Sequence, residues 1–262
     1  FVSKATGVQL AKAAVMIGLG KTIAELKAEG YLPKNMDGAS LPQNTAIAVK
    51  AAVLPFSRFR TPEGVVVDSL LSPEMRSTGE VMGLDTLYDT AFAKAQAGAG
   101  SPLPTEGKVF VSVANHDKRN VIIYAKMLEQ LGFEIVSTGG TADVLRRNGV
   151  NSTVASKFAE ANGQHSIVDM VRNGEIDLIL NTPAGGAARS DGYEIRAAAV
   201  SVGCPVMTTI SEFAAAVQAI TALRERSWEI INLQEHGEFL RTASTGEQGQ
   251  DKGEQVREGE LS

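Results

Sequence analysis

The chain has 262 residues, of which 44% are hydrophobic and 21% are charged, so it can form one large domain or two smaller ones around a real core. Its formal net charge of -5 excludes the broad basic face of a general nucleic-acid binder. No apolar run approaches the about 20 residues of a membrane span, and no secretory leader is present. We therefore expect a cytoplasmic protein without a nucleic-acid or membrane partner.

Cysteine and histidine are too scarce to indicate redox or metal chemistry. Cys204 is the only cysteine, which excludes an intrachain disulfide, and its place before Pro205 is typical of a small core residue. The three histidines, His116, His165 and His236, lack the spacing of metal ligands. We predict no metal site in this chain.

The chain opens at Phe1 without a methionine or a polar lead, which favours a piece of a longer polypeptide. Gly20-Lys21-Thr22 resembles the end of a triphosphate-binding loop, but Val15 stands where that motif requires glycine. Thr22 and Glu25 instead have the spacing of a capping box that begins a helix.

The rest of the first third is broken by proline and glycine before a predicted helix over 86–97. The segment 73–83, PEMRSTGEVMG, mixes acids, a base and hydroxyls. Taken alone, it predicts a polar connection before that helix. The small residues and prolines of 97–104, AGAGSPLP, then predict a linker.

Residues 108 to about 234 alternate between short apolar runs and helical periodicity. The predicted strands are 109–113, 133–136, 176–180, a stretch near Val206, and 229–233, which would close the sheet. The predicted helices are 117–131, a short one ending at Arg147, 165–173, 191–202 and 211–225. This alternation predicts a parallel α/β sheet covered on both faces, with ligands at the carboxyl ends of the strands. The polar sequence after Arg241 predicts disorder.

The strongest local motif is 137–141, STGGT, between a predicted strand and a predicted helix. Gly139 and Gly140 allow the backbone to turn tightly and approach a ligand, and the helix N-terminus favours phosphate. Thr138 and Thr141 add hydroxyl donors. The alternative is a glycine turn in which Thr141 is only the N-cap of the helix.

Other phosphate-binding residue types follow the neighbouring strands. Lys118 comes after the first strand, Lys157 after the third, and Asn181 with Thr182 after the fourth. Each lysine alone is more often a solvated surface charge. Together these residues predict a rim that binds a phosphorylated small molecule.

The segments 1–8, FVSKATGV, 53–59, VLPFSRF, and 73–83 resemble the second ATP-grasp unit of the carbamoyl-phosphate synthase large subunit. Residues 108–234 resemble the methylglyoxal-synthase-like domain that ends that subunit. The resemblance implies an incomplete ATP-grasp segment over 1–97, a linker over 98–107, a three-layer parallel-sheet allosteric domain over 108–240 and a disordered tail over 241–262.

In that family the intact enzyme uses ATP, with Mg or Mn, to make carbamoyl phosphate from bicarbonate and glutamine-derived ammonia. The resemblance implies the rest of the large subunit and a glutaminase small subunit as partners, and a role in pyrimidine or arginine biosynthesis. The family's ATP and metal ligands would lie before Phe1, so we expect this chain alone to be inactive and to carry no catalytic residue.

The last domain in this family binds nucleotide effectors such as UMP or IMP. Carried over by position, the phosphate contacts are Lys118, Thr138, Gly139, Gly140, Thr141, Lys157, Asn181 and Thr182. The chain departs from the family at Pro183, where a threonine is expected. Thr208 matches a contact to ornithine, a possible second effector, but Ala51 replaces the glutamate for that ligand, which argues against an ornithine response.

Three alternatives remain at this point. The STGGT turn also occurs in methylglyoxal synthase, a lyase that needs an aspartate and a histidine; Asp177, Asp191 and His116 are the available groups. The turn occurs as well in the IMP cyclohydrolase half of a purine-synthesis enzyme, although 168–186 does not resemble its continuation. A stand-alone module that senses a phosphorylated ligand is the third.

Overall fold

The computed structural model describes residues 1–34, 46–58, 61, 68–71, 74–156, 166–182 and 185–236, and the side chains of 57 and 185–191 are outside this description. The chain divides into two compact units, one formed by Phe1–Ala46 with Glu229–Ser262 and the other by Ile47–Trp228. Lys157, His165, Pro183 and the tail after Arg241 lie outside the described residues.

The first unit contains three short helices, α1 (Val2–Thr6), α2 (Leu10–Gly18) and α3 (Ile23–Ala28). The predicted capping box is confirmed: Thr22 accepts a hydrogen bond from the backbone N–H of Glu25, whose side chain accepts from the backbone N–H of Thr22. In the same unit, Nε2 of the buried His236 lies 3.4 Å from the carbonyl oxygen of Ala5.

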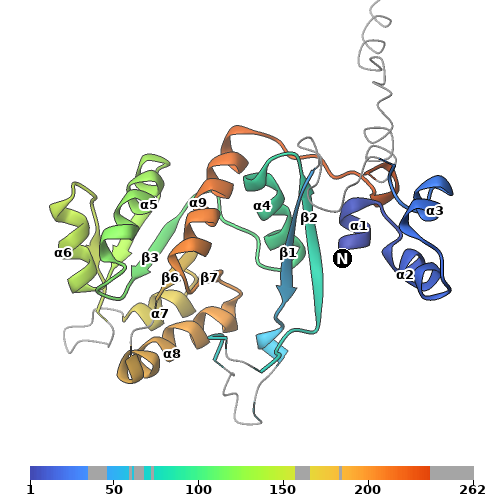
Figure 1. Cartoon of the computed structure of the whole chain (residues 1–262). Coiled ribbons are helices and arrows are strands. Elements are labelled where there is room, and N and C mark those ends of the chain that lie inside the picture. Colours follow the sequence, from blue (N-terminus) through green and yellow to red (C-terminus); the bar gives the residue numbers. More distant parts are fainter. Residues whose placement is uncertain are drawn as a thin grey trace, which may run out of the picture. The chain divides into compact units, whose positions relative to one another are not determined.

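The second unit begins with an antiparallel pair of strands that packs on a helix. Strand β1 (Ile47–Val53) pairs with β2 (Gly79–Asp85), a short 3-10 helix η1 (Phe56–Arg58) lies between them in the chain, and α4 (Tyr88–Gly98) follows. Figure 1 shows α4 beside the pair. A Cβ added to Gly83 would lie 1.9 Å from the carbonyl oxygen of Ala91, so only glycine allows this close approach.

These strands correct the prediction of a polar connection over 73–83, because residues 79–83 belong to β2. The strand forms because Val81, Met82 and Leu84 have the partner strand β1 and the helix α4 to pack against, which the local sequence does not reveal.

A five-stranded parallel sheet forms the rest of the unit, which confirms the predicted α/β class. Its strands are β3 (Lys108–Ser112), β4 (Glu134–Ser137), β5 (Thr153–Val154), β6 (Leu178–Asn181) and β7 (Val206–Met207), in the order β5-β4-β3-β6-β7. The connecting helices are α5 (Lys118–Gln130), α6 (Gly139–Arg147), α7 (Ile167–Arg172) and α8 (Gly185–Val202), and α9 (Ile210–Glu225) follows β7.

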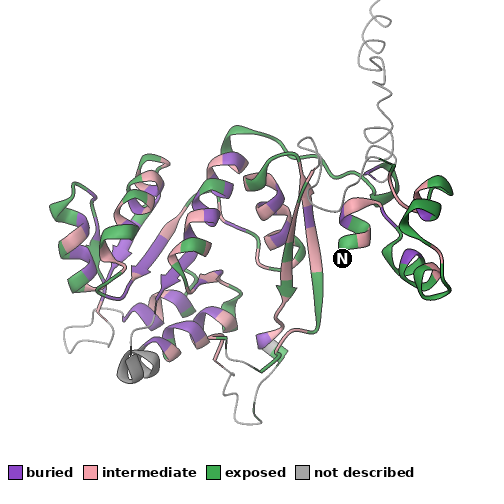
Figure 2. Ribbon diagram, viewed as in Figure 1, coloured by how far each residue is buried: buried purple, intermediate pink, exposed green. Residues whose placement is uncertain are grey.

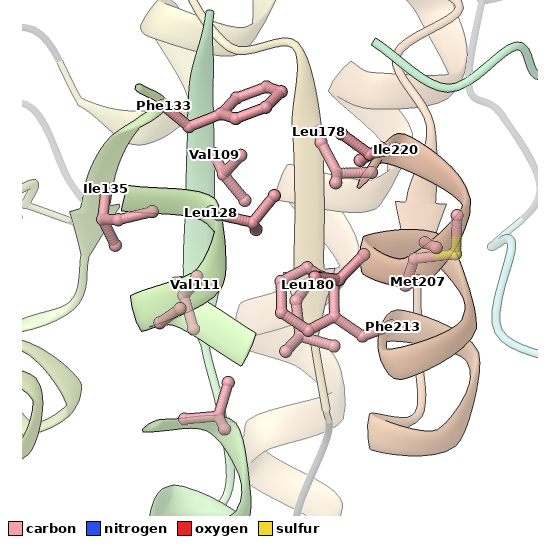
Figure 3. Packing of buried hydrophobic residues seen from close by; sticks show 14 of the residues in the cluster. Val109, Val111, Leu128, Phe133, Ile135, Leu178, Leu180, Met207, Phe213 and Ile220 are labelled. Atoms are coloured by element: carbon pink, nitrogen blue, oxygen red, sulfur yellow. The ribbon is translucent and has the colours of Figure 1, made fainter. Parts of the chain in front are cut away.

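Alternate side chains of the strands enter two separate cores, as a sheet covered on both faces requires. Val109, Val111 and Leu180 pack with residues of α5 and α9, including Leu128 and Phe213 (Figure 3). Phe110 and Ile179 face the opposite side, where they pack with α7 and α8. Figure 2 shows the strands of this sheet as largely buried. The result is the predicted three-layer arrangement.

The prediction of a final strand over 229–233 is wrong. Residues 226–232 have no regular secondary structure, and the side chain of Ile230 is 90% exposed. The edge of the sheet is β7, which has only two residues and offers little backbone to pair with. The strand was predicted from apolar residues alone. A strand also needs a neighbouring strand whose backbone groups can hydrogen-bond to it, and these residues do not pair with one.

The segment after α4 is packed more tightly than a linker. Helix α4 continues through Gly98, and Leu103 is only 8% exposed within the same core cluster as Phe213. Leu103 therefore holds part of this segment against the core.

Candidate functional site

The candidate site is built at the carboxyl ends of three neighbouring strands, β4, β3 and β6. The strand register places Val111 beside Ser137 and Ser112 beside Asn181. The loops that leave these strands are therefore brought to one edge of the sheet, where ligands bind in open α/β sheets.

The STGGT motif forms the turn from β4 into α6, and it leaves the start of the helix available. Thr138, with extended backbone angles, is the N-cap, and its side chain makes no capping hydrogen bond. The alternative in which Thr141 is the N-cap does not hold, because Thr141 lies in the first turn and is 1% exposed. The nine-residue helix α6 therefore keeps the positive end of its dipole for another partner.

The two threonine hydroxyls of the motif lie together at this edge. The Oγ1 atoms of Thr138 and Thr141 are 3.4 Å apart, and Oγ of Ser112 lies 3.4 Å from that of Thr138. Oγ1 of Thr141 also accepts a long hydrogen bond of 3.5 Å from the backbone N–H of Val113. A hydroxyl that accepts from a backbone N–H still has its own proton to donate.

Lys118 brings a positive charge directly to the glycine turn. It is the first residue of α5, and a Cβ added to Gly140 would lie 3.1 Å from Nζ of Lys118. A side chain at position 140 would therefore crowd the ammonium group. Nζ of Lys118 therefore lies beside the backbone of the STGGT turn.

Thr182 lies on the other side of β3 and is engaged in the same manner. Its Oγ1 accepts a hydrogen bond of 2.9 Å from the backbone N–H of Ala114, and the residue is 8% exposed. The sequence places Thr182 immediately after the strand, and the structure shows that it holds the loop following β3. Because the hydroxyl of Thr182 accepts this bond, its own proton is still available for donation to an acceptor.

Asn181 is held inside the protein by a side chain that the sequence analysis missed. Nη1 of Arg196 donates a hydrogen bond of 2.8 Å to Oδ1 of Asn181, while Nδ2 of Asn181 lies 3.4 Å from the carbonyl oxygen of Ser112. Arg196 is completely buried in α8 and forms a two-pronged ion pair with Asp68, with Nε and Nη2 each 2.7 Å from a carboxylate oxygen. A lone arginine in the alanine-rich stretch 195–199 was the only signal in the sequence.

Of the remaining predicted site residues, only Thr208 lies in the described part of the chain. Lys157 lies outside the described residues. Thr208 follows the edge strand β7, and its backbone N–H donates a hydrogen bond of 3.2 Å to Oε2 of Glu212. Burial raises the pKa of Glu212, and the bond from Thr208 opposes that rise.

Metal and thiol chemistry have no support in the described part of the chain. Among these residues no group of three or more histidine, cysteine, aspartate and glutamate side chains could hold a metal ion. Burial, with the nearby charge of Asp177, raises the pKa of the Cys204 thiol to about 12, so the thiol stays protonated at neutral pH. In the same described ranges, no helix is both long and apolar enough to cross a bilayer.

Comparison with known proteins gives two findings. Residues 120–208 match the family described as MGS-like domain. The chain is also 64% identical to the carbamoyl phosphate synthase large chain of Kocuria rhizophila over 253 residues, which are 96% of this chain and 23% of that protein. The proteins of the same name from Pseudarthrobacter chlorophenolicus and Streptomyces griseus are 65% and 55% identical, over 92% and 93% of this chain and 22% of each relative.

These matches confirm the resemblance drawn from the sequence motifs. The part of the chain that carries STGGT, Asn181 and Thr208 is an MGS-like domain. The chain spans less than a quarter of the length of these curated relatives.

Proposed function

From the premise that the chain carries an MGS-like domain and matches carbamoyl phosphate synthase large chains along nearly its whole length, we propose that its carboxyl-edge pocket binds the phosphate of a nucleotide effector. The observation that carries the proposal is the position of Lys118 Nζ against Gly140, within the turn that also carries the paired hydroxyls of Thr138 and Thr141. We assign Gly139 and Thr182 to the same proposed site, with Lys157 as its second cation.

The chemistry of these groups favours a phosphate over a neutral ligand. An ammonium group, hydroxyl protons and the N-terminus of α6 are all donors to an anion, and they converge from separate elements. Oγ1 of Thr141 already accepts from the backbone, so its proton is the part left to offer. UMP-like or IMP-like monophosphates are the ligands that the family resemblance suggests.

We further propose that the effector regulates a carbamoyl-phosphate synthase of which this chain is the C-terminal portion. The intact enzyme would use ATP and Mg or Mn to join bicarbonate with ammonia supplied by a glutaminase small subunit. This chain would contribute regulation and would be inactive by itself. An effector alters activity only if it binds two states of the enzyme unequally, so the pocket must change with the state of the remaining large subunit.

A lyase of the methylglyoxal synthase type receives less support from the same geometry. Asp177, one of its candidate acids, precedes β6 and therefore lies at the amino edge of the sheet, where it accepts a hydrogen bond of 2.7 Å from the backbone N–H of Lys108. His116 is 75% exposed and lies 3.4 Å from Asp117. A general base needs to reach the bound substrate, and Asp177 lies at the opposite edge of the sheet from the proposed site.

Isothermal titration of the complete 262-residue chain with UMP, IMP and inorganic phosphate tests the proposal. We expect saturable binding of at least one monophosphate, weakened about 10- to 100-fold by Lys118→Ala, since a charge-assisted hydrogen bond contributes about 1.5–3 kcal/mol. Lys126→Ala, an exposed lysine on the same helix, is the matched control and should bind as the unaltered chain does. Absence of binding by all three ligands would refute the effector site.

A further inference from the structure

We infer that Arg196 and Asp68 are positioning residues for the phosphate pocket: they fix the side-chain amide of Asn181 and join the pocket to the segment 68–71. The inference rests on the proposed function, because it specifies how that same pocket is built and coupled. It arises from three contacts at one buried guanidinium group.

The orientation of the Asn181 amide follows from the chemistry of its neighbour. An arginine side chain has donors and no acceptor, so the atom of Asn181 that lies 2.8 Å from Nη1 must be the amide oxygen. The amide nitrogen is then directed toward β3, where it lies 3.4 Å from the carbonyl oxygen of Ser112. Arg196 therefore makes Asn181 present N–H donors, and not its oxygen, to the edge where an anion would bind.

Asp68 in turn fixes the guanidinium group. Its two carboxylate oxygens accept hydrogen bonds from Nε and Nη2 of Arg196, each at 2.7 Å. Because the guanidinium group is planar, these two bonds fix its orientation and direct Nη1 at Asn181. The arginine side chain is fully buried, while the Asp68 side chain is 30% exposed, so the guanidinium end of the pair is shielded from water. Gly192 provides the space: a Cβ there would lie 2.3 Å from Nη1 of Arg196 and 2.6 Å from Oδ1 of Asn181.

These contacts continue into the STGGT turn. Ser112, whose carbonyl oxygen faces the Asn181 amide, also has its hydroxyl 3.4 Å from that of Thr138. The hydroxyl oxygen of Thr138 lies 3.4 Å from that of Thr141. A ligand that orders the threonines and Asn181 should therefore stabilise the Arg196–Asp68 pair. By reciprocity, displacement of Asp68 should weaken ligand binding by the same factor.

The first arm of the test needs no ligand. The ¹⁵N side-chain amide signal of Asn181, identified by its loss in Asn181→Ala, is compared between the unaltered chain and the double variant Asp68→Asn/Arg196→Met. Both charges are removed together because a single change would leave one charge buried and unpaired. We expect a large shift and faster hydrogen exchange of the Asn181 amide protons. The exposed pair Asp89→Asn/Arg226→Met is the matched control and should leave this signal unchanged.

The second arm measures the affinity of the complete chain for UMP and for inorganic phosphate. The double variant should bind about tenfold more weakly than the unaltered chain, and in an Asn181→Ala background the same two changes should have almost no further effect. An equal loss in both backgrounds, or an unchanged Asn181 signal in the first arm, would overturn the inference.

A third measurement avoids substitutions at the ion pair, whose loss could unfold the chain. In the unaltered protein, UMP should slow deuterium exchange of a peptide spanning 68–71, and Asn181→Ala should abolish that protection. Protection that persists without the Asn181 amide would contradict the coupling. If the unaltered chain binds neither UMP nor phosphate, the proposed function fails, while the Asn181 signal of the first arm still decides whether Arg196 and Asp68 position the amide.

Discussion

The two edges of the parallel sheet have opposite chemistry. At the amino edge, polar groups pair with one another: Asp177 accepts from the backbone N–H of Lys108, whose Nζ lies 3.4 Å from a carboxylate oxygen of Glu134. At the carboxyl edge, an ammonium group, hydroxyls and a helix N-terminus gather, and within the described residues none of these groups is paired with an acid. One edge is satisfied by the fold itself, and the other is arranged to receive an anion. Four experiments test this difference.

The largest effect is expected from reversing a charge at the carboxyl edge. Lys118→Glu should weaken monophosphate binding by about 100-fold or more, since it removes a charge-assisted bond and adds repulsion. Calorimetric titration gives the affinity. Lys108→Glu makes the same change at the amino edge, where it should leave binding intact. Equal losses in the two variants would remove the distinction between the edges.

The amino edge should instead govern stability. Asp177→Ala would leave the backbone N–H of Lys108 without its acceptor, at a cost of about 1–3 kcal/mol in the free energy of unfolding. Urea denaturation followed by circular dichroism measures this loss. Monophosphate affinity of the folded variant should not change. Weakened binding would show that the two edges are coupled.

The hydroxyls at the carboxyl edge should contribute less than the charge. Thr141→Val keeps the shape of the buried side chain and removes its donor, so we expect about a tenfold loss of affinity, in line with roughly 1.5 kcal/mol for a hydrogen bond to a charged group. Thr221→Val, at a hydroxyl that donates within α9, is the matched control and should not alter the calorimetric titration.

The smallest effect is expected at Glu212, a carboxylate that follows the edge strand β7. Because burial raises its pKa in the folded protein, ionisation of Glu212 destabilises the fold, and this penalty grows as pH rises above the ordinary value of 4.5. Glu212→Gln should therefore raise the urea midpoint at pH 7, and the difference should vanish at pH 4 and below. If Glu212→Gln stabilised the protein more at low pH than at high pH, the raised pKa of Glu212 in the folded protein would be contradicted.

Much of the fold was predictable because its strands and helices alternate regularly. Short apolar runs and helical periodicity located β3, β4, β6 and the helices between them, and parallel pairing then placed their carboxyl ends together. The same reasoning predicted that Lys118 would meet the STGGT turn. The run over 229–233 failed because its apolar residues look like a strand whether or not a partner strand exists.

The Arg196–Asp68 pair could not have been predicted. Its members are 128 positions apart, and nothing near Asp68 identifies it as the counter-charge of a residue in α8. The sequence also left open which threonine is the N-cap of α6, since Thr138 and Thr141 both flank the two glycines. The two glycines predict the turn, but the backbone angles of the structure are needed to show that Thr138 begins the helix.

The burial of Leu103 has a consequence for how this region can be moved between proteins. Leu103 shares a core with Ala93 of α4 and with Phe213 and Ile220 of α9. A fragment that began at Lys108 would lack Ala93 and Leu103, so the apolar surface of α9 that they cover would be exposed to solvent. We expect such a fragment to self-associate. A transfer of the five-stranded sheet to another protein should therefore include α4 and the segment that follows it.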